Sequence, residues 1–193
     1  IFFEIIIANG FDKKSLTILK KRKNLRVIDS SNLKEKSKIN YSNRLNTILV
    51  QDSDNINFTK KNFRVVSKKK PSKELLNKLI FAFNVCRNVK SNAIVITKDY
   101  KTVGIGSGQS SRLDSCKIAI DKMKKFQKTT DDYDLLAASD AFFPFVDGLE
   151  TLVQAGVTGV IQPSGSKNDK KIIKFANQTG TILVFSHTRH FNH

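Results

Sequence analysis

Residues 135–161 read LLAASDAFFPFVDGLETLVQAGVTGVI and contain one strand–loop–helix–strand passage. The apolar run at 135–138 predicts a strand. The apolar positions around 149–155 predict a helix, and the β-branched run at 157–161 predicts the next strand. Strands that alternate with helices in this way favour an α/β architecture with a mainly parallel or mixed sheet.

The same alternation continues on both sides of this stretch. Loops that follow successive strands of such a sheet gather at one edge, where α/β proteins bind ligands, so we expect the binding site at that edge. Pro71 and Ser72 suit the first turn of a helix, and Gly180 suits the stop of another. The elements predicted around the stretch are a helix at 71–85, strands at 92–96 and 102–105, a helix at 110–126, a helix that ends at 177 and a strand at 181–185.

The beginning of the chain follows the same pattern. Asp12 can cap a helix, and we expect the apolar positions of that helix, Leu16, Ile18 and Leu19, to face inward. Strands are predicted on either side of the helix, and a polar surface loop follows the second strand. These further elements are strands at 1–8, 25–28 and 47–50 and the loop at 30–45.

A chain of 193 residues is long enough to bury a core of its own. No window approaches the roughly 18 consecutive apolar residues that a membrane helix needs, and no basic-then-apolar leader opens the chain. We therefore expect a cytoplasmic protein without a membrane partner. Because the chain opens on Ile1 and its only methionine is Met123, we also expect it to begin inside a longer protein.

The net charge of +17 suggests a polyanion such as nucleic acid as a partner. The excess is concentrated in residues 1–100, which hold 22 Lys and Arg against 8 Asp and Glu, whereas residues 101–193 hold 12 against 9. Basic runs such as 20–23 and 68–70 lack the interleaved aromatic residues that stack on bases. We interpret these runs as a solvated face and expect no nucleic-acid partner, while a basic nucleic-acid-binding α/β module remains the alternative function.

The spacing of cysteines and histidines indicates no metal site. Cys86 and Cys116 lie in helix-like segments without a Cys-x-x-Cys pair, which argues against zinc and for reduced, buried thiols. The three histidines follow a predicted strand. In an extended chain their odd spacing sends His190 to the opposite face from His187 and His193, so the three would not share a metal ion.

Three loops carry residues suited to ligand chemistry. The glycine-rich turn from Gly104 to Arg112 opens a helix and could bind phosphate or carboxylate, with a plain hairpin-to-helix turn as the alternative. The aromatic run between Asp140 and Asp147 is suited to a flat, hydrogen-bonding ring, with core packing as the alternative. The turn at 163–167 could receive an anion, or could be an ordinary helix cap.

Taken together and in this order, these segments resemble the transformylase domain of the PurH family of bifunctional purine-biosynthesis enzymes. The resemblance covers essentially the whole chain. The matching phrases are EIIIA at 4–8, LVQD at 49–52, VKSNAI at 89–94, GIGSGQSSR at 104–112, SDAFFPF at 139–145, PSGS at 163–166 and RHFNH at 189–193.

The resemblance implies a three-layer α/β/α subdomain of the cytidine-deaminase-like kind, with a mixed sheet and without zinc. It implies transfer of a formyl group from the co-substrate 10-formyltetrahydrofolate to the 5-amino group of aminoimidazole carboxamide ribonucleotide (AICAR). By the same resemblance we expect a homodimer with active sites between subunits. Residues 1–193 would be the C-terminal part of the transformylase domain, without the cyclohydrolase domain of the parent enzyme.

Residue roles follow from the resemblance by position. The residues expected to contact the nucleotide are Glu4, Asn92, Arg112, Phe142 and Arg189, and those expected to contact the folate are Leu113, Asp147, Ser166 and Lys167. Asn92 and His193 are the candidate catalytic auxiliaries, with His193 near the reacting amine.

The family assigns proton transfer and oxyanion stabilisation largely to a Lys-His pair. No Lys-His step occurs in this chain, so the segment that bears the pair would be missing and the isolated chain is expected to be inactive. A purely structural dimerisation domain is the remaining alternative.

Overall fold

A computed structural model describes residues 2–33, 39–56, 58–126 and 134–192. The chain divides into two compact units, residues 1–57 and residues 58–193, and each is described by itself. Among the described residues, no helix has both the length and the apolar character needed to cross a membrane.

The first unit contains two small sheets. Strands β1 (Ile5–Ala8) and β2 (Arg26–Asp29) pair in parallel, and helix α1 (Lys13–Leu19) connects them. Strands β3 (Ile39–Arg44) and β4 (Thr47–Asp52) form an antiparallel hairpin.

The cap of α1 forms as expected. The Asp12 carboxylate accepts a hydrogen bond from the Ser15 amide at 2.7 Å, which lowers the pKa of Asp12 from its ordinary value. The inward orientation of Ile18 was wrong, because this side chain is 65% exposed. The prediction of a loop across 30–45 was also wrong at 39–44, where β3 lies. The Asn and Ser residues of this strand are typical of a loop, which is why the sequence did not indicate it. Pairing with β4 satisfies the hydrogen-bonding groups of its backbone.

The second unit is built on a six-stranded mixed sheet with the order β5-β10-β9-β8-β6-β7. Strands β8, β9 and β10 are parallel to one another, β6 is antiparallel to both β8 and β7, and β5 is antiparallel to β10. The strands are β5 (Phe63–Val65), β6 (Ile94–Lys98), β7 (Lys101–Gly106), β8 (Leu135–Ser139), β9 (Val157–Pro163) and β10 (Ile182–Ser186).

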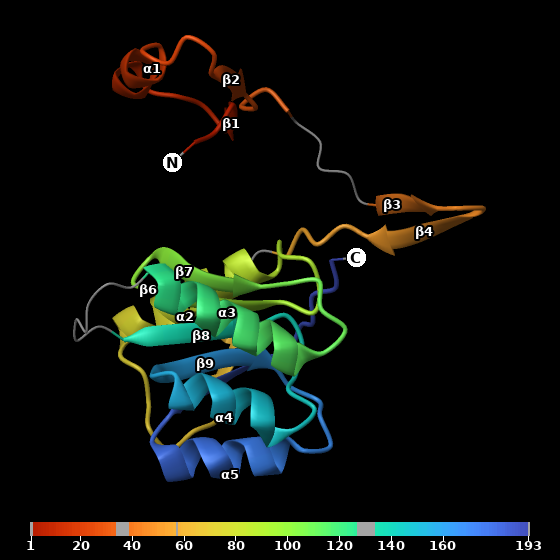
Figure 1. The fold of residues 1–193 in the computed structure, drawn as a ribbon, viewed down its shortest axis with the longest axis vertical. Helices are drawn as coiled ribbons and strands as arrows, with labels where there is room; N and C mark the ends of the chain where they lie inside the picture. The colour runs from red at the N-terminus through yellow and green to blue at the C-terminus, as the bar shows by residue number, and fades with distance from the viewer. Residues whose placement is uncertain (1, 34–38, 57, 127–133, 193) are drawn as a thin grey trace. The chain divides into compact units, whose positions relative to one another are not determined.

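Helices cover both faces of this sheet, so the predicted three-layer α/β/α architecture with a mixed sheet is confirmed. Helix α2 packs on one face, and α3, α4 and α5 pack on the other (Figure 1). Each face has its own apolar core, which fixes the sheet between the two helical layers. The helices are α2 (Lys73–Cys86), α3 (Arg112–Phe126), α4 (Val146–Gln154) and α5 (Asp169–Thr179), and a short 3-10 turn (Lys60–Asn62) precedes β5.

The ends of these helices follow from local chemistry. The Ser72 hydroxyl accepts a hydrogen bond from the Leu75 amide at 3.1 Å and caps α2. Gly180 ends α5 in the left-handed conformation, with φ at +66°, as the sequence predicted.

The two cysteines are free and fully buried, as expected. Burial raises the pKa of Cys116 to about 12 and raises that of Cys86 well above its ordinary value. Both groups are therefore neutral thiols of the core.

Candidate ligand-binding site

A hollow of about 580 Å³ lies at one edge of the sheet in the second unit. At this edge β8 ends, β6 begins and helix α3 starts, so the surrounding loops come from separate parts of the chain. The prediction that ligand-suited loops gather at one sheet edge is confirmed. The hollow is lined by Asn92, Ser110, Ser111, Arg112, Leu113, Ala141, Phe142, Phe143, Pro144, Phe145, Asp147, Gly148, Arg189 and Phe191.

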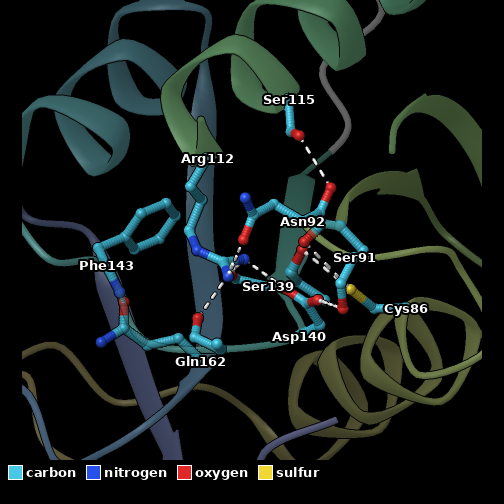
Figure 2. A network of polar contacts seen from close by, with 12 residues as sticks. Cys86, Ser91, Asn92, Arg112, Ser115, Ser139, Asp140, Phe143 and Gln162 are labelled. Carbon is cyan, nitrogen blue, oxygen red and sulfur yellow. Dashed lines mark hydrogen bonds and ion pairs between the residues drawn. The ribbon is translucent and has the colours of Figure 1, made fainter. Parts of the chain in front are cut away.

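A buried ion pair forms the floor of this region. Arg112, the first residue of α3, donates from Nη1 to the Asp140 carboxylate and, at 2.9 Å, to the Ser139 hydroxyl (Figure 2). The Arg112 side chain is 9% exposed and that of Asp140 is 1% exposed. The carboxylate neutralises the guanidinium, which offsets much of the cost of burying either charge.

The same network fixes the side chain of Asn92. Arg112 donates from Nη2 to the amide oxygen of Asn92 at 2.8 Å. The Asn92 amide nitrogen donates to the carbonyl oxygens of Gln109 at 2.9 Å and Ser110 at 3.3 Å. The second Asp140 oxygen accepts from the Ser91 hydroxyl at 2.5 Å. Asn92 is therefore held in one orientation at the wall of the hollow.

This geometry changes the interpretation of Arg112. From the sequence we expected Arg112 to supply a fixed positive fork for phosphate or carboxylate. In the structure both terminal nitrogens already donate within the protein, to Ser139, Asp140 and Asn92. Arg112 therefore orders the site, and only its remaining N–H groups are left for a ligand.

The aromatic turn after β8 divides its side chains between core and hollow. Phe143 is 1% exposed and packs against Gly148, where an added Cβ would lie 2.6 Å from the ring. The Phe143 amide donates to the Gln162 side-chain oxygen at 3.4 Å. Phe142 instead faces the hollow, where the Arg189 guanidinium lies 4.4 Å from its ring centroid. Core packing therefore accounts for Phe143, while a ligand-binding role for Phe142 stays a prediction.

The turn at 163–167 is held by an acidic residue of α5. The Asp169 carboxylate accepts from the amides of Gly165 at 2.8 Å and Ser166 at 3.2 Å. The amides of Gly165 and Ser166 therefore bond within the protein, and the turn acts as a local cap. These two amides are not available to bind an anion, as one of the two sequence alternatives required. Asn168 ties the turn to the aromatic run by donating to the Pro144 carbonyl oxygen at 2.6 Å.

The structure brings together most of the residues expected to bind ligands. Six line the one hollow, namely Asn92, Arg112, Leu113, Phe142, Asp147 and Arg189. Ser166 and Lys167 lie in the next loop and outside the lining. Glu4 belongs to the first unit, and His193 lies outside the described residues.

Sequence reasoning assigned no role to four residues that hold the site in place. These are Ser91, Ser139, Gln162 and Asp169. The available signal was their position: Ser139 and Gln162 lie at the ends of strands, Asp169 begins α5, and Ser91 lies in the loop before β6. Their partners are distant in sequence or lie across a turn, and a linear pattern does not indicate such pairings.

Acidic, histidine and cysteine side chains do not cluster in the described parts of the chain. No group of three or more that could hold a metal ion occurs there. His187 is exposed and His190 is buried, so the two point into different environments.

Comparison with known proteins identifies the family. The model of the family described as the AICARFT/IMPCHase bienzyme matches residues 1–122. The chain belongs to this family. The resemblance seen in its motifs is thereby confirmed, and the chain is related to bifunctional enzymes of purine biosynthesis.

Curated relatives of this family align with the whole chain. "Bifunctional purine biosynthesis protein PurH" of Prochlorococcus marinus (strain AS9601) is 40% identical over 195 residues. The protein of the same name from Thermoanaerobacter sp. (strain X514) is 42% identical over 195 residues. Each alignment covers 100% of this chain and 37% of the relative, so the chain spans little more than a third of the length of these family members.

The family model matches the first 122 residues of this chain and does not place the chain within its longer relatives. Our assignment to the C-terminal part of the transformylase domain is not carried by these matches and stays a prediction. Among solved structures, the dCMP deaminase from the cyanophage S-TIM5 is 16% identical, with a TM-score of 0.37, and the match covers 58% of this chain and 98% of the deaminase.

Proposed function

We propose that this chain forms the ribonucleotide subsite, and part of the folate subsite, of a cytoplasmic formyltransferase. The reaction would transfer a formyl group from 10-formyltetrahydrofolate to the 5-amino group of AICAR, in a homodimer. The observation that carries the proposal is that six residues assigned to these two ligands line one hollow. They come from four separate segments of a chain that belongs to the AICARFT/IMPCHase family.

The chemistry of the hollow suits a flat, polar ring. Its volume of about 580 Å³ lies within the range of small-molecule sites, and its walls combine aromatic rings with a few fixed polar groups. Phe142 offers a ring face for stacking, and the Asn92 amide oxygen, which accepts one hydrogen bond from Arg112, can accept a second. The Arg189 guanidinium supplies positive charge for a phosphate.

These residues would bind and orient the reactants. An aromatic amine is a weak nucleophile, so holding it against the formyl donor provides much of the rate enhancement. Of the described residues, the ionisable ones that line the hollow are Arg112, Asp147 and Arg189. None is a histidine or lysine poised to transfer a proton near neutral pH. The isolated chain is therefore proposed to bind its ligands without completing the reaction.

The rival function, a basic nucleic-acid-binding module, would use a different surface. A second hollow of about 390 Å³ lies over α5. Among the described residues, no aromatic side chain and no predicted ligand contact lines it, and stacking on bases therefore has no platform there. Its lining residues are Lys68, Lys170, Ile173, Lys174, Asn177 and Gln178.

The two hollows provide a test with a matched control. We would titrate the chain with AICAR by calorimetry at two salt concentrations, alongside Arg189→Ala and Lys174→Ala, with circular dichroism to show that each variant folds. Arg189→Ala is expected to weaken binding about tenfold or more because it removes a cation and its contact with Phe142. Lys174→Ala is expected to bind like the unmodified chain.

Equal binding by Arg189→Ala would contradict the proposal. Binding that falls steeply with salt and is lost in Lys174→Ala would instead support a polyanion-binding module.

A further inference from the structure

The segment after β10, residues 187–192, has two sides with different roles. Arg189 and Phe191 line the hollow, and Phe191 is 48% exposed. His190, between them, is only 3% exposed. Neighbouring residues of a chain without helical structure can point to opposite sides, and here one side meets the hollow and the other enters the core.

The His190 ring belongs to an aromatic cluster, which we define as Phe58, Phe63, Phe83 and His190. Phe83 and His190 are buried, and Phe58 and Phe63 are partly buried. The centroid of the His190 ring lies 4.8 Å from that of Phe83 and 5.3 Å from that of Phe58. The three phenylalanine rings lie 5.4 to 5.8 Å from one another, in tilted and edge-to-face arrangements. Rings at these distances pack favourably, so His190 docks the segment onto the α2 side of the sheet.

Backbone hydrogen bonds connect the docked segment to the Arg112 network. The His190 amide donates to the Asp140 carbonyl oxygen at 2.9 Å. The Ser91 amide donates to the Asn192 carbonyl oxygen at 3.0 Å. Asp140 pairs with Arg112, and the Ser91 hydroxyl donates to Asp140, so the segment and the floor of the hollow share their anchoring points.

The position of Arg189 follows from this docking. Its guanidinium lies 4.4 Å from the centroid of the Phe142 ring. It also approaches Gly165, where an added Cβ would lie 2.9 Å from Nη2. A side chain confined in this way requires its backbone to stay in place, and the neighbouring His190 ring is what enters the core.

We propose that His190 is a positioning residue of the site, which acts through Arg189 and Phe191 on the affinity for the ribonucleotide. The inference rests on the proposed function for the identity of the ligand. The new element is a role for His190, whose ring lies in the core and does not line the hollow, so the ligand would not contact it.

A double-mutant cycle tests this mechanism. We would measure AICAR binding by calorimetry for His190→Ala, Arg189→Ala and the double variant. If His190 acts through Arg189, each single change weakens binding about tenfold, and the double variant binds within about twofold of Arg189→Ala. Fully additive losses, or normal affinity of His190→Ala, would overturn the proposal.

Two further variants separate positioning from general destabilisation. His190→Phe keeps an aromatic ring in the cluster and is expected to restore the affinity to within about threefold of the unmodified chain. Ile172→Ala removes an equally buried side chain on the opposite face of the sheet and is expected to leave affinity unchanged. Loss of affinity in Ile172→Ala equal to that in His190→Ala would count against a specific role. If His190→Ala does not fold, His190→Leu takes its place in the cycle.

Amide hydrogen exchange gives a readout that needs no ligand. In His190→Ala the amides of residue 190 and Ser91 are expected to exchange about tenfold faster or more, while the amides of β9 keep their rates. Unchanged exchange at both amides would overturn the proposal. If the unmodified chain does not bind AICAR, the proposed function fails, and the exchange rates still decide whether His190 anchors the segment.

Discussion

At the scale of single residues, the floor of the hollow depends on the ion pair between Arg112 and Asp140. Both side chains are nearly inaccessible, and each is satisfied by the other and by neighbouring hydroxyl and amide groups. Removing one partner from such a pair leaves the other as an uncompensated charge in the core. The pair is therefore expected to control stability as well as the shape of the site.

Replacing Arg112 by alanine is expected to lower the free energy of unfolding by about 3–5 kcal/mol, and Asp140→Ala by a similar amount. The double variant is expected to lose less than the sum of the two, because it buries no unpaired charge. Urea denaturation measures all three values.

The pair between Lys117 and Asp114 on the same helix is the control. Its atoms are 3.8 Å apart and its side chains are 60% and 52% exposed. Lys117→Ala is expected to change stability by less than about 1 kcal/mol. The account would be contradicted if Arg112→Ala and Asp140→Ala each lowered the free energy of unfolding as little as Lys117→Ala does, and if the two losses simply added in the double variant. The buried pair would then not be coupled.

The identity of the site residues could be predicted at this scale, but their partners could not. Arg112 and Phe142 were expected near a ligand from their motifs, and both line the hollow. The bond from Arg112 to Asp140 joins residues 28 positions apart. Nothing in the local sequence indicates that the guanidinium is already engaged, so its internal partners could be found only from the structure.

At the scale of secondary-structure elements, the placement of α3 depends on two glycines of β7. A Cβ on Gly104 would lie 2.0 Å from the Ala119 carbonyl oxygen, and a Cβ on Gly106 would lie 1.9 Å from that of Ser115. Both contacts are with the backbone of α3, one helical turn apart. The sequence favours a turn in this glycine-rich run, where a ligand could approach the backbone. Two of its glycines instead let the helix approach the strand.

Gly106→Ala is expected to destabilise the protein by about 3 kcal/mol, because the helix backbone must move away from β7. It should also weaken ligand binding, since Arg112 starts the displaced helix. Thermal and urea unfolding measure the first effect, and titration with AICAR measures the second.

Gly108→Ala is the matched comparison. An added Cβ meets nothing within 4 Å there, and the positive φ of +67° is the only penalty. This change is expected to cost about 1 kcal/mol. A larger loss for Gly108→Ala than for Gly106→Ala would contradict the packing role assigned to Gly106.

Elements with strong periodicity were predictable and short edge elements were not. The helix predicted at 71–85 lies within a few residues of the observed α2, although Ser72 is its cap and not part of its first turn. It missed β5, which has three residues and is defined by its pairing with β10. It also missed β3, where Asn and Ser positions are typical of a loop and the apolar residues Ile39 and Tyr41 are exposed. The partner of β5 is distant in the chain, and local sequence does not describe it. The partner of β3 is the next strand, so there the polar composition alone concealed the hairpin.

At the scale of the whole molecule, two units with different character share one chain. The second unit has two apolar cores, one on each face of a six-stranded sheet, and it contains the hollow. The first unit has no buried residue in α1 and exposes large apolar side chains on β1 and β4, including Ile7 and Val50. The fold of the second unit followed from the alternation of strands and helices, because each element there has a clear apolar face.

The central claim is that the hollow at the edge of this sheet binds the ribonucleotide. The most direct test is to map amide chemical-shift changes by nuclear magnetic resonance while AICAR is added to the chain. We expect the largest changes at Asn92, Arg112, Phe142 and Arg189 and at the residues beside them. Changes centred on Lys68, Lys170 and Lys174, or confined to the first unit, would contradict the account.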